Sequence, residues 1–379
     1  MKVLNVNMSM DPVFGGGTVE RTLQISREMS RIGINVVVLT TDIGLSEENK
    51  KAFDGFEVIA LPCIIKRLYL PKFSYKHVKK LVADSDVVHL MGHWTFLNAL
   101  VYYVAKKLKK PYVVCPAGAL PIYGRSKIIK KLYNLIVGNK IISNATACVA
   151  VAVNEKAHFK GYGVDVDMVS FIPNGVNNDD FTERDGNKFR KKYHLGLKHF
   201  ILFVGRLNYI KGPDLLLRAF SDIQDKFTGY HLVFAGPDGG MLKELKSSVA
   251  HFSLEDRVHF IGYLGLEDKV SAYQESALLV IPSRQEAMSI VVLEAGISNK
   301  PVLITDQCGF NDIEDVNGGL VVSASSDSIR NGLIEVLGDP EKLFSMGKNL
   351  ESYVRNNFTW KIAVDKYIQL YHIIMNNEK

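Results

Sequence analysis

The order of apolar runs along the chain constrains its fold more than any other feature. Short β-branched runs, such as 3–9 and 35–41, alternate with longer segments of helical period, of which 19–33 is the first. Most strand-like runs are continuously apolar, a pattern typical of parallel sheets that helices cover on both faces. The sequence therefore predicts an α/β fold of doubly wound parallel sheets.

The alternation occurs twice, before and after the turn-rich stretch PNGVNNDD at 173–180. Pro, Gly and consecutive Asn residues mark turns and loops. A chain of 379 residues also exceeds what a single hydrophobic core usually serves. We expect two Rossmann-like domains, 1–175 and 176–357. A C-terminal helical segment, 358–379, is expected to pack back toward the first domain.

Targeting signals are missing from the sequence. No stretch approaches the roughly 20 uninterrupted apolar residues of a membrane span, and Asp11 and Pro12 interrupt the N-terminus where a secretory signal would be apolar. The cysteines have no metal-ligand spacing, which favours reduced core thiols in a cytoplasmic protein. They are Cys63, Cys115, Cys148 and Cys308.

The charge is divided unevenly between the two halves. Residues 1–175 contain 23 Lys and Arg against 13 Asp and Glu, a net charge of +10, whereas the remainder contains 23 against 27, a net charge of −4. The basic residues cluster in 66–80, 106–110 and 125–140. This polarity indicates an anionic partner for the first half, such as a phospholipid surface or a phosphorylated acceptor. Nucleic acid is not expected, because interleaved aromatics and a recognition motif are lacking.

One basic segment has a second property. In 126–140, SKIIKKLYNLIVGNK, five apolar side chains fall on one helical face and most lysines fall elsewhere. Such a helix either lies on an anionic membrane or packs into the core with a solvated basic face.

The first motif with chemical potential follows the first expected strand. Gly15, Gly16 and Gly17 precede a helix that we expect to begin near Thr18. Glycines let backbone N–H groups approach a phosphate at a helix N-terminus. The spacing is not GxGxxG, so a dinucleotide fingerprint is absent. Taken alone, the three glycines are better explained as a flexible turn.

The second motif comes directly after the apolar run 200–204. Arg206 and Lys211 stand in the element G-R-L-x-x-x-K-G, five residues apart. At the end of a central strand, two such cations can converge on a diphosphate, Arg as a fork and Lys as a point charge. A solvated pair on a loop is the alternative.

The third motif contains two glutamates. Glu286 lies on an expected loop after a strand that ends at Ser283, Ser289 is expected to cap a helix, and Glu294 lies on the flank of that helix. The helix N-terminus can hold a phosphate while each carboxylate accepts hydrogen bonds from hydroxyls. This arrangement suits a nucleoside-diphosphate sugar, with ribose on one side and hexose on the other. The alternative is an exposed loop acid and an ordinary helix residue, although Glu294 interrupts the apolar stretch IVVLEAGI.

With these motifs, the chain resembles the retaining glycosyltransferases of family 4 over nearly its whole length. Their GT-B fold has two Rossmann-like domains facing each other across a cleft. PNGV at 173–176, the strand PVLITD and Cys308-Gly309 also fit the family. The resemblance implies transfer of a hexose from a UDP- or GDP-sugar to a glycan or lipid-linked acceptor, in the synthesis of cell-surface polysaccharide or lipopolysaccharide. It implies neither a cofactor nor a metal.

The resemblance also implies roles for individual residues. Arg206 and Lys211 would bind the donor diphosphate, Glu294 the ribose hydroxyls and Glu286 the transferred sugar. The positive charges of Arg206 and Lys211, with the dipole of the helix at Ser289, would stabilise a leaving diphosphate that accepts the proton of the incoming hydroxyl. The catalytic residues would be Glu286, Arg206, Lys211 and His93. The remaining donor-binding residues would be Gly16, Gly17, Ala287, Met288, Ser289 and Ile290.

The sequence departs from the family pattern in places. Relatives often carry His-x-His-Gly and a later His-Gly, whereas this chain has Met91 and Ala117 where two of those histidines would be. His93, beside Trp94, is then the remaining histidine that can reach the acceptor, and a His packed against an aromatic ring is the alternative. Met288-Ser289 replaces a common Gly-Phe-Gly, which leaves the transferred sugar open.

Two other functions would require different sets of residues. A sugar-nucleotide 2-epimerase of the same fold would need acid and base residues at the donor C2, and the sequence offers no such set. A non-catalytic partner subunit would not need the charged residues of the second and third motifs. Asp179-Asp180 is interpreted as a solvated turn rather than a metal site.

Overall fold

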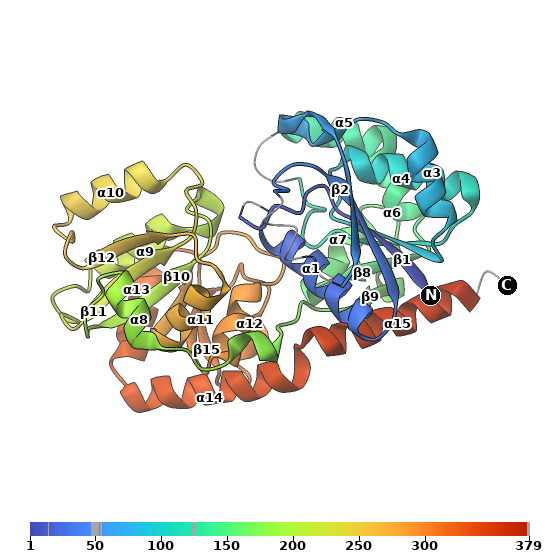
Figure 1. Cartoon of the computed structure of the whole chain (residues 1–379). Helices are drawn as coiled ribbons and strands as arrows, with labels where there is room; N and C mark the ends of the chain where they lie inside the picture. The colour runs from blue at the N-terminus through green and yellow to red at the C-terminus, as the bar shows by residue number, and fades with distance from the viewer. Residues whose placement is uncertain (14, 47–52, 54, 123–125, 377–379) are drawn as a thin grey trace. The chain divides into compact units, whose positions relative to one another are not determined.

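The computed structural model describes residues 1–13, 15–46, 53, 55–122 and 126–376 (Figure 1). The chain forms two compact units. Unit 1 comprises Met1–Gly175 and Trp360–Lys379, and unit 2 comprises Val176–Thr359. Residue 125 of the third basic cluster and the last three residues of the expected C-terminal segment lie outside the described residues.

Unit 1 is built on a parallel sheet. In its described part, seven strands lie in the order β3-β2-β1-β6-β7-β8-β9. All residues of the central strands β6 and β7 are buried, as the continuous apolar runs predicted. The strands are β1 (Lys2–Val6), β2 (Asn35–Thr41), β3 (Glu57–Leu61), β6 (Val87–Met91), β7 (Tyr112–Cys115), β8 (Ala147–Ala150) and β9 (Val169–Phe171). A separate antiparallel pair consists of β4 (Cys63–Ile65) and β5 (Leu70–Pro71).

The helices of unit 1 come from both ends of the chain. Figure 1 shows α15, in red, beside α1, in blue. The fully buried guanidinium of Arg21 in α1 donates hydrogen bonds to Asn174 Oδ1 and to the hydroxyl of Tyr367 in α15. The hydroxyl of Tyr371, also in α15, lies 2.7 Å from His89 Nδ1 in β6. The helices are α1 (Gly16–Arg31), α3 (Tyr75–Ala83), α4 (Phe96–Leu108), α5 (Lys127–Tyr133), α6 (Asn139–Ser143), α7 (Lys156–Lys160) and α15 (Trp360–Asn376).

Unit 2 repeats the architecture. Among its described residues, six parallel strands lie in the order β12-β11-β10-β13-β14-β15. They are β10 (His199–Val204), β11 (Tyr230–Ala235), β12 (Val258–Gly262), β13 (Leu278–Ile281), β14 (Val302–Thr305) and β15 (Gly319–Val322). The helices are α8 (Gly186–Lys192), α9 (Pro213–Ser221), α10 (Leu242–His251), α11 (Leu266–Glu275), α12 (Ile290–Ile297), α13 (Ser326–Leu337) and α14 (Pro340–Asn357).

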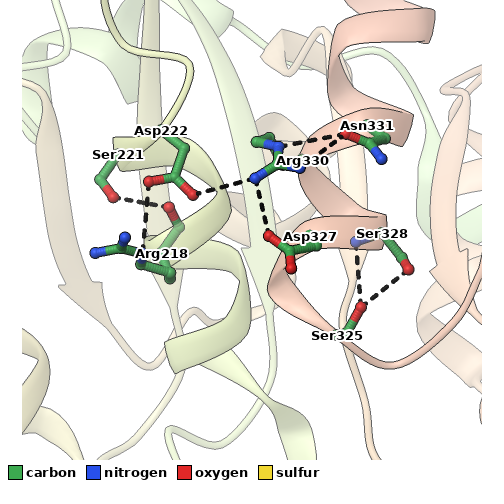
Figure 2. A network of polar contacts seen from close by, with 8 residues as sticks. All are labelled: Arg218, Ser221, Asp222, Ser325, Asp327, Ser328, Arg330 and Asn331. Atoms are coloured by element: carbon green, nitrogen blue, oxygen red, sulfur yellow. Dashed lines mark hydrogen bonds and ion pairs between the residues drawn. The ribbon is translucent and has the colours of Figure 1, made fainter.

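Helices α9 and α13 pack together in unit 2. Figure 2 shows Arg330 of α13 between Asp327, at 2.8 Å, and Asp222, which follows α9, at 3.9 Å. Partly exposed ion pairs of this kind contribute little to stability. The buried apolar side chains beneath them therefore dominate the packing. They include Leu216, Leu217, Phe220, Ile329 and Leu333.

Both sheets have the strand order of a Rossmann fold. Counted from β1 and from β10, the first six strands of each sheet lie in the order 3-2-1-4-5-6. Ligands of such sheets bind beyond the carboxyl ends of the strands where this order reverses. These points lie between β1 and β6 in unit 1 and between β10 and β13 in unit 2. The predicted fold class, two doubly wound Rossmann-like domains, is confirmed.

Two other sequence-based expectations can be compared with the structure. The cysteines are free thiols, three of them buried and Cys63 half-buried. Within the described ranges, no helix is both long enough and apolar enough to cross a membrane.

Candidate functional site

The loops after β10 and β13 meet at the switch point of unit 2. Gly212, at the end of the first loop, has φ +67°, and an added Cβ would lie 2.1 Å from the carbonyl oxygen of Pro282. Glycine alone tolerates both this conformation and this approach. The glycine of the K-G pair therefore lets the loop that carries Lys211 lie against the end of β13.

Arg284 joins the same two loops. Its guanidinium forms a forked pair with Asp214, at 2.9 and 2.6 Å, and also donates to the carbonyl oxygen of Tyr209 at 2.7 Å. Its backbone N–H donates to the carbonyl oxygen of Ile210 at 2.7 Å. A bidentate pair of this kind restricts the movement of both side chains. The two loops are therefore held at a fixed distance.

Lys211 and Glu286 are brought together by these loops. Lys211 Nζ lies 2.8 Å from Glu286 Oε1, which also accepts a hydrogen bond from Ser283 Oγ at 2.5 Å. The backbone N–H of Glu286 donates to the carbonyl oxygen of Gln307 at 2.8 Å, so the loop after β14 joins the group. One cation and one carboxylate are thus fixed side by side at the switch point.

Arg206 lies on the same loop as Lys211, directly after β10. Its side chain packs against Gly239, where an added Cβ would lie 2.8 Å from Arg206 Cγ. The loop after β11, Gly-Pro-Asp-Gly-Gly at 236–240, therefore supports Arg206. Asp238 in this loop accepts hydrogen bonds from the backbone N–H groups of Gly240, Leu242 and Met241, which lower the pKa of its carboxyl group. We did not identify this loop from the sequence, although its three glycines after an apolar strand were a usable signal.

Helix α12 begins where the sequence predicts, but its capping residue behaves differently. Ser289 occupies the N-cap position without a side-chain capping hydrogen bond. Its hydroxyl oxygen is buried and has no hydrogen-bond partner among the described residues. Its backbone N–H donates to the carbonyl oxygen of Cys308 at 3.3 Å. Ser289 is therefore the N-cap residue, as expected, but its hydroxyl forms no capping hydrogen bond, and among the described residues an unpaired polar group lies at the positive end of a helix.

The residues around Ser289 are closely packed. An added Cβ at Gly309, which has φ +66°, would lie 1.7 Å from the carbonyl oxygen of Ala287. Met288 is buried, whereas Ala287 and Ile290 are half-buried. The backbone of 287–290 is thus held between the loop after β14 and the start of α12.

Glu294 lies in the body of α12 and is only 6% exposed. Its Oε1 accepts a hydrogen bond from Lys269 Nζ at 2.5 Å, and its Oε2 accepts one from the hydroxyl of Tyr273 at 2.6 Å. Both partners lie on α11, one turn apart, and we did not identify them from the sequence. Their i,i+4 spacing in an expected helix shows that they share a face, but not that the face meets α12.

In unit 1, the glycine motif forms the start of a helix. Helix α1 begins at Gly16 with Gly15 as its N-cap residue, so the predicted start near Thr18 is wrong. Gly16 and Gly17 are exposed residues of the first turn. The N–H groups of a first turn have no partners within the helix.

His93 follows β6, the other strand at the switch point of unit 1. It is 1% exposed and lies against the rings of Trp94, Tyr133 and Tyr162, at centroid distances of 4.5, 5.7 and 5.4 Å. Its Nε2 lies 3.0 Å from Oδ1 of Asn134, the first residue of a π-helical turn, Asn134–Gly138, after α5. Burial lowers the pKa of His93 to about 4. The structure thus agrees with the alternative in which His93 packs against an aromatic ring. The contacts of Asn134 and Tyr162 with His93 were not foreseen from the sequence.

The acidic pair Asp179-Asp180 follows the linker, in a turn that packs against α11 and α12. Asp179 and Asp180 lie in the 3-10 turn Asn178–Phe181, and Asp179 is exposed. Across the described residues, no group of three or more His, Cys, Asp and Glu side chains is placed to hold a metal ion.

Two family models match the chain, one in each unit. Glycosyltransferase Family 4 matches residues 15–180, and Glycosyl transferases group 1 matches residues 185–353. An uncharacterised glycosyltransferase of Methanocaldococcus jannaschii is 26% identical, with 99% of both chains covered. The D-rhamnosyltransferase WbpZ of Pseudomonas aeruginosa is 28% identical over 75% of this chain and 73% of the relative.

Solved structures of the same fold match the whole chain. The Anabaena protein HepE in complex with UDP and glucose superposes with a TM-score of 0.81 at 18% identity, covering 98% of this chain and 99% of HepE. The sucrose-phosphate synthase of Thermosynechococcus elongatus superposes with a TM-score of 0.78 at 19% identity, covering 100% of both chains. At these identities the similarity establishes the fold, which is GT-B.

Proposed function

The chain belongs to glycosyltransferase family 4, and from this premise we propose that it is a retaining, metal-independent hexosyltransferase that uses a UDP- or GDP-sugar. The observation that supports this proposal is the cluster of polar and charged side chains at the switch point of unit 2. There the Lys211–Glu286 pair lies on loops joined to the N-terminus of α12, where the hydroxyl of Ser289 is unpaired among the described residues. HepE, a protein of the same fold, was solved with UDP-glucose, which supports a nucleotide-sugar donor.

The diphosphate would bind to the positive groups of this site. Arg206 and Lys211 supply cations, and α12 supplies backbone N–H groups and the positive end of its dipole. A buried hydroxyl without a partner costs free energy. A phosphate oxygen that accepted a hydrogen bond from Ser289 Oγ would remove this cost. We therefore assign Arg206, Lys211, Ser289 and the backbone of Ala287, Met288 and Ile290 to phosphate and sugar binding.

The two glutamates would bind the two ends of the donor. Glu286 lies beside Lys211 and would hydrogen-bond to the transferred hexose. Glu294 would accept hydrogen bonds from the ribose. During transfer, negative charge builds up on the leaving diphosphate as the bond to the anomeric carbon breaks. Fixed cations and helix N–H groups stabilise such charge without the reorganisation that water would need. This provides the electrostatic role that a metal has in other transferases.

The acceptor would use unit 1. Gly16 and Gly17, also in unit 1, would instead offer first-turn N–H groups to the donor diphosphate. His93 is neutral at physiological pH, because burial lowers its pKa to about 4. We therefore propose that His93 contributes to acceptor binding through a hydrogen bond and does not take the proton of the acceptor hydroxyl. No observation favours the 2-epimerase or the silent subunit over this account.

An anionic membrane surface is proposed as the place of reaction, with a glycan or lipid-linked acceptor of cell-surface polysaccharide or lipopolysaccharide synthesis. In α5 and the π-helical turn, Ile128 is 82% exposed and Leu135 77% exposed, next to Lys127 and Lys131. The alternative of a core-packed apolar face does not fit these exposures. Exposed apolar patches beside lysines suit the inner, cytoplasmic face of a membrane.

The donor assignment is tested by calorimetric titration of UDP and GDP. We expect Arg206→Ala and Glu294→Ala each to weaken the preferred nucleotide by about 10- to 100-fold, because each removes a hydrogen bond to or from a charged group. Arg218→Ala, at an exposed arginine of α9, is the control and should retain wild-type affinity. Unchanged affinity in both site variants would contradict the assignment.

The membrane assignment is tested by co-sedimentation with anionic liposomes at low salt. The double substitution Ile128→Glu and Leu135→Glu should reduce pelleting by about tenfold, because it removes apolar area and adds negative charge. Leu197→Glu changes a residue of unit 2 that is 90% exposed and should not affect pelleting. A wild-type protein that stays in the supernatant contradicts membrane contact.

A further inference from the structure

The carboxylate of Glu294 is held from one side by α11. Lys269 Nζ bonds to one oxygen at 2.5 Å, and the hydroxyl of Tyr273 bonds to the other at 2.6 Å. Because an ionised carboxylate only accepts hydrogen bonds, the hydroxyl of Tyr273 must be the donor. Each oxygen of Glu294 therefore has one fixed donor of its own.

The carboxylate of Glu294 can accept further hydrogen bonds, and their number can be counted. An ionised carboxylate has about four acceptor positions, two on each oxygen. Lys269 and Tyr273 occupy two of them, and no other side chain among the described residues bonds to this group. One acceptor position is left on each oxygen. This number matches the two adjacent hydroxyls of a ribose.

The two donors differ in what they contribute. Lys269 places a positive charge beside a nearly buried carboxylate and donates a hydrogen bond to its Oε1. Tyr273 is fully buried, and its pKa is raised well above the usual value by burial and by Glu294, so it remains a hydroxyl donor. The side chain of Tyr273 also packs against the ring of Phe181, which limits its rotation.

We propose that Lys269 and Tyr273 are positioning residues that set the preference of the donor site for ribonucleotides over deoxyribonucleotides. They fix Glu294 so that one acceptor position on each oxygen faces the 2′- and 3′-hydroxyls. This inference rests on the proposed function, in which Glu294 binds the ribose. The competing explanation is that these contacts only stabilise the packing of α11 against α12.

The chain contains a matched control on the same helix. Asp268, the residue before Lys269, accepts hydrogen bonds from Lys192 Nζ and from the hydroxyl of Tyr193 at 3.0 Å. It is thus also a carboxylate held by one lysine and one tyrosine. Tyr193→Phe removes the same type of hydrogen bond as Tyr273→Phe without affecting Glu294.

The test compares the affinities of UDP and 2′-deoxy-UDP by calorimetry, with GDP and 2′-deoxy-GDP as a second pair. We expect the wild-type protein to prefer the ribonucleotide by about 10- to 100-fold, the usual range for a hydrogen bond to a charged group. In Tyr273→Phe and Lys269→Met the preference should fall to about threefold or less. Lys269→Arg, which keeps a cationic donor, and Tyr193→Phe should keep most of it.

The outcomes separate the inference from the proposed function. If the wild-type protein binds neither UDP nor GDP, the proposed function fails. If the wild-type protein prefers ribonucleotides and both Tyr273→Phe and Lys269→Met keep that preference, the inference is overturned. This holds even if the affinities for the ribonucleotide and the deoxyribonucleotide fall by the same factor, as expected for a purely structural contact between α11 and α12. Tyr273→Phe removes a single oxygen atom and provides the test if Lys269→Met does not fold.

Discussion

At the scale of single residues, the buried histidines give unit 1 a dependence on pH. Burial lowers the pKa of His93 to about 4 and that of His89 to about 3, whereas a histidine in an unfolded chain titrates near 6.5. Between these values the unfolded chain binds more protons than the folded chain. This contribution to stability is present above about pH 6.5 and is lost as the pH falls toward 4.

Urea unfolding at pH 7 and pH 5 measures this effect. We expect the free energy of unfolding to drop by about 2 kcal/mol for each buried histidine. His93→Gln should reduce the difference between the two pH values by about half. A difference that is unchanged in His93→Gln would show that His93 is not buried in its neutral form.

The residues of the proposed donor site were predictable to different degrees. Arg206, Lys211 and Glu286 follow apolar runs in the sequence, and the ends of parallel strands meet at one edge of a sheet, so their region could be predicted. The Lys269 and Tyr273 partners of Glu294 could not, because a helical period gives the face of α11 but not its neighbour. The missing hydroxyl cap at Ser289 depends on local backbone geometry, which the residue type does not determine.

At the scale of elements, the close approach of two loops makes Gly212 sensitive to substitution. Gly212→Ala introduces a Cβ at φ +67°, 2.1 Å from the carbonyl oxygen of Pro282. We expect a loss of about 1–3 kcal/mol in unfolding free energy, together with weaker nucleotide binding, because Lys211 is displaced. Gly163→Ala, in unit 1 at φ +78° with open space around the Cβ, provides the control for backbone strain alone.

Thermal unfolding and calorimetry of these two variants check the prediction. Gly163→Ala should lose stability without losing nucleotide affinity. If Gly212→Ala binds UDP or GDP as the wild-type protein does, the loop contact does not position the donor site.

The central strands and the edge strand β12 could be predicted, but three other edge strands could not. β6, β7, β13 and β14 are buried along their whole length and read as continuous apolar runs. By contrast, β3, β9 and β15 lie at or toward the sheet edges with partly buried or exposed residues, which weakens the apolar pattern. The helix expected in 126–140 is interrupted by a π-helical turn, a feature set by its contacts rather than by residue propensity.

At the scale of the whole molecule, the C-terminal helix completes unit 1. The hydroxyl of Tyr367 in α15 accepts a hydrogen bond from the buried guanidinium of Arg21 in α1. Tyr367→Phe leaves this cation with one acceptor fewer and should cost about 1–3 kcal/mol. We expect faster amide hydrogen exchange in unit 1, including residues 2–6 of β1, and unchanged exchange in unit 2.

Tyr353→Phe supplies the comparison in unit 2. Its ring packs against Phe310 and Phe358, and a phenylalanine preserves this packing. Exchange should therefore stay at wild-type rates in both units. If Tyr367→Phe speeds exchange equally in units 1 and 2, or in neither, α15 does not stabilise unit 1 through Arg21.

The proposed transfer of a hexose from a UDP- or GDP-sugar with retention is tested most directly by acceptor-free hydrolysis. Wild-type protein would be incubated with a panel of UDP-, GDP- and ADP-sugars, and products followed by proton NMR. We expect slow release of UDP or GDP and of a hexose that first appears with the donor's anomeric configuration. We also expect a rate at least about tenfold lower in Lys211→Met. Failure to bind or hydrolyse any donor of the panel, or first release of the opposite anomer, would contradict the proposal.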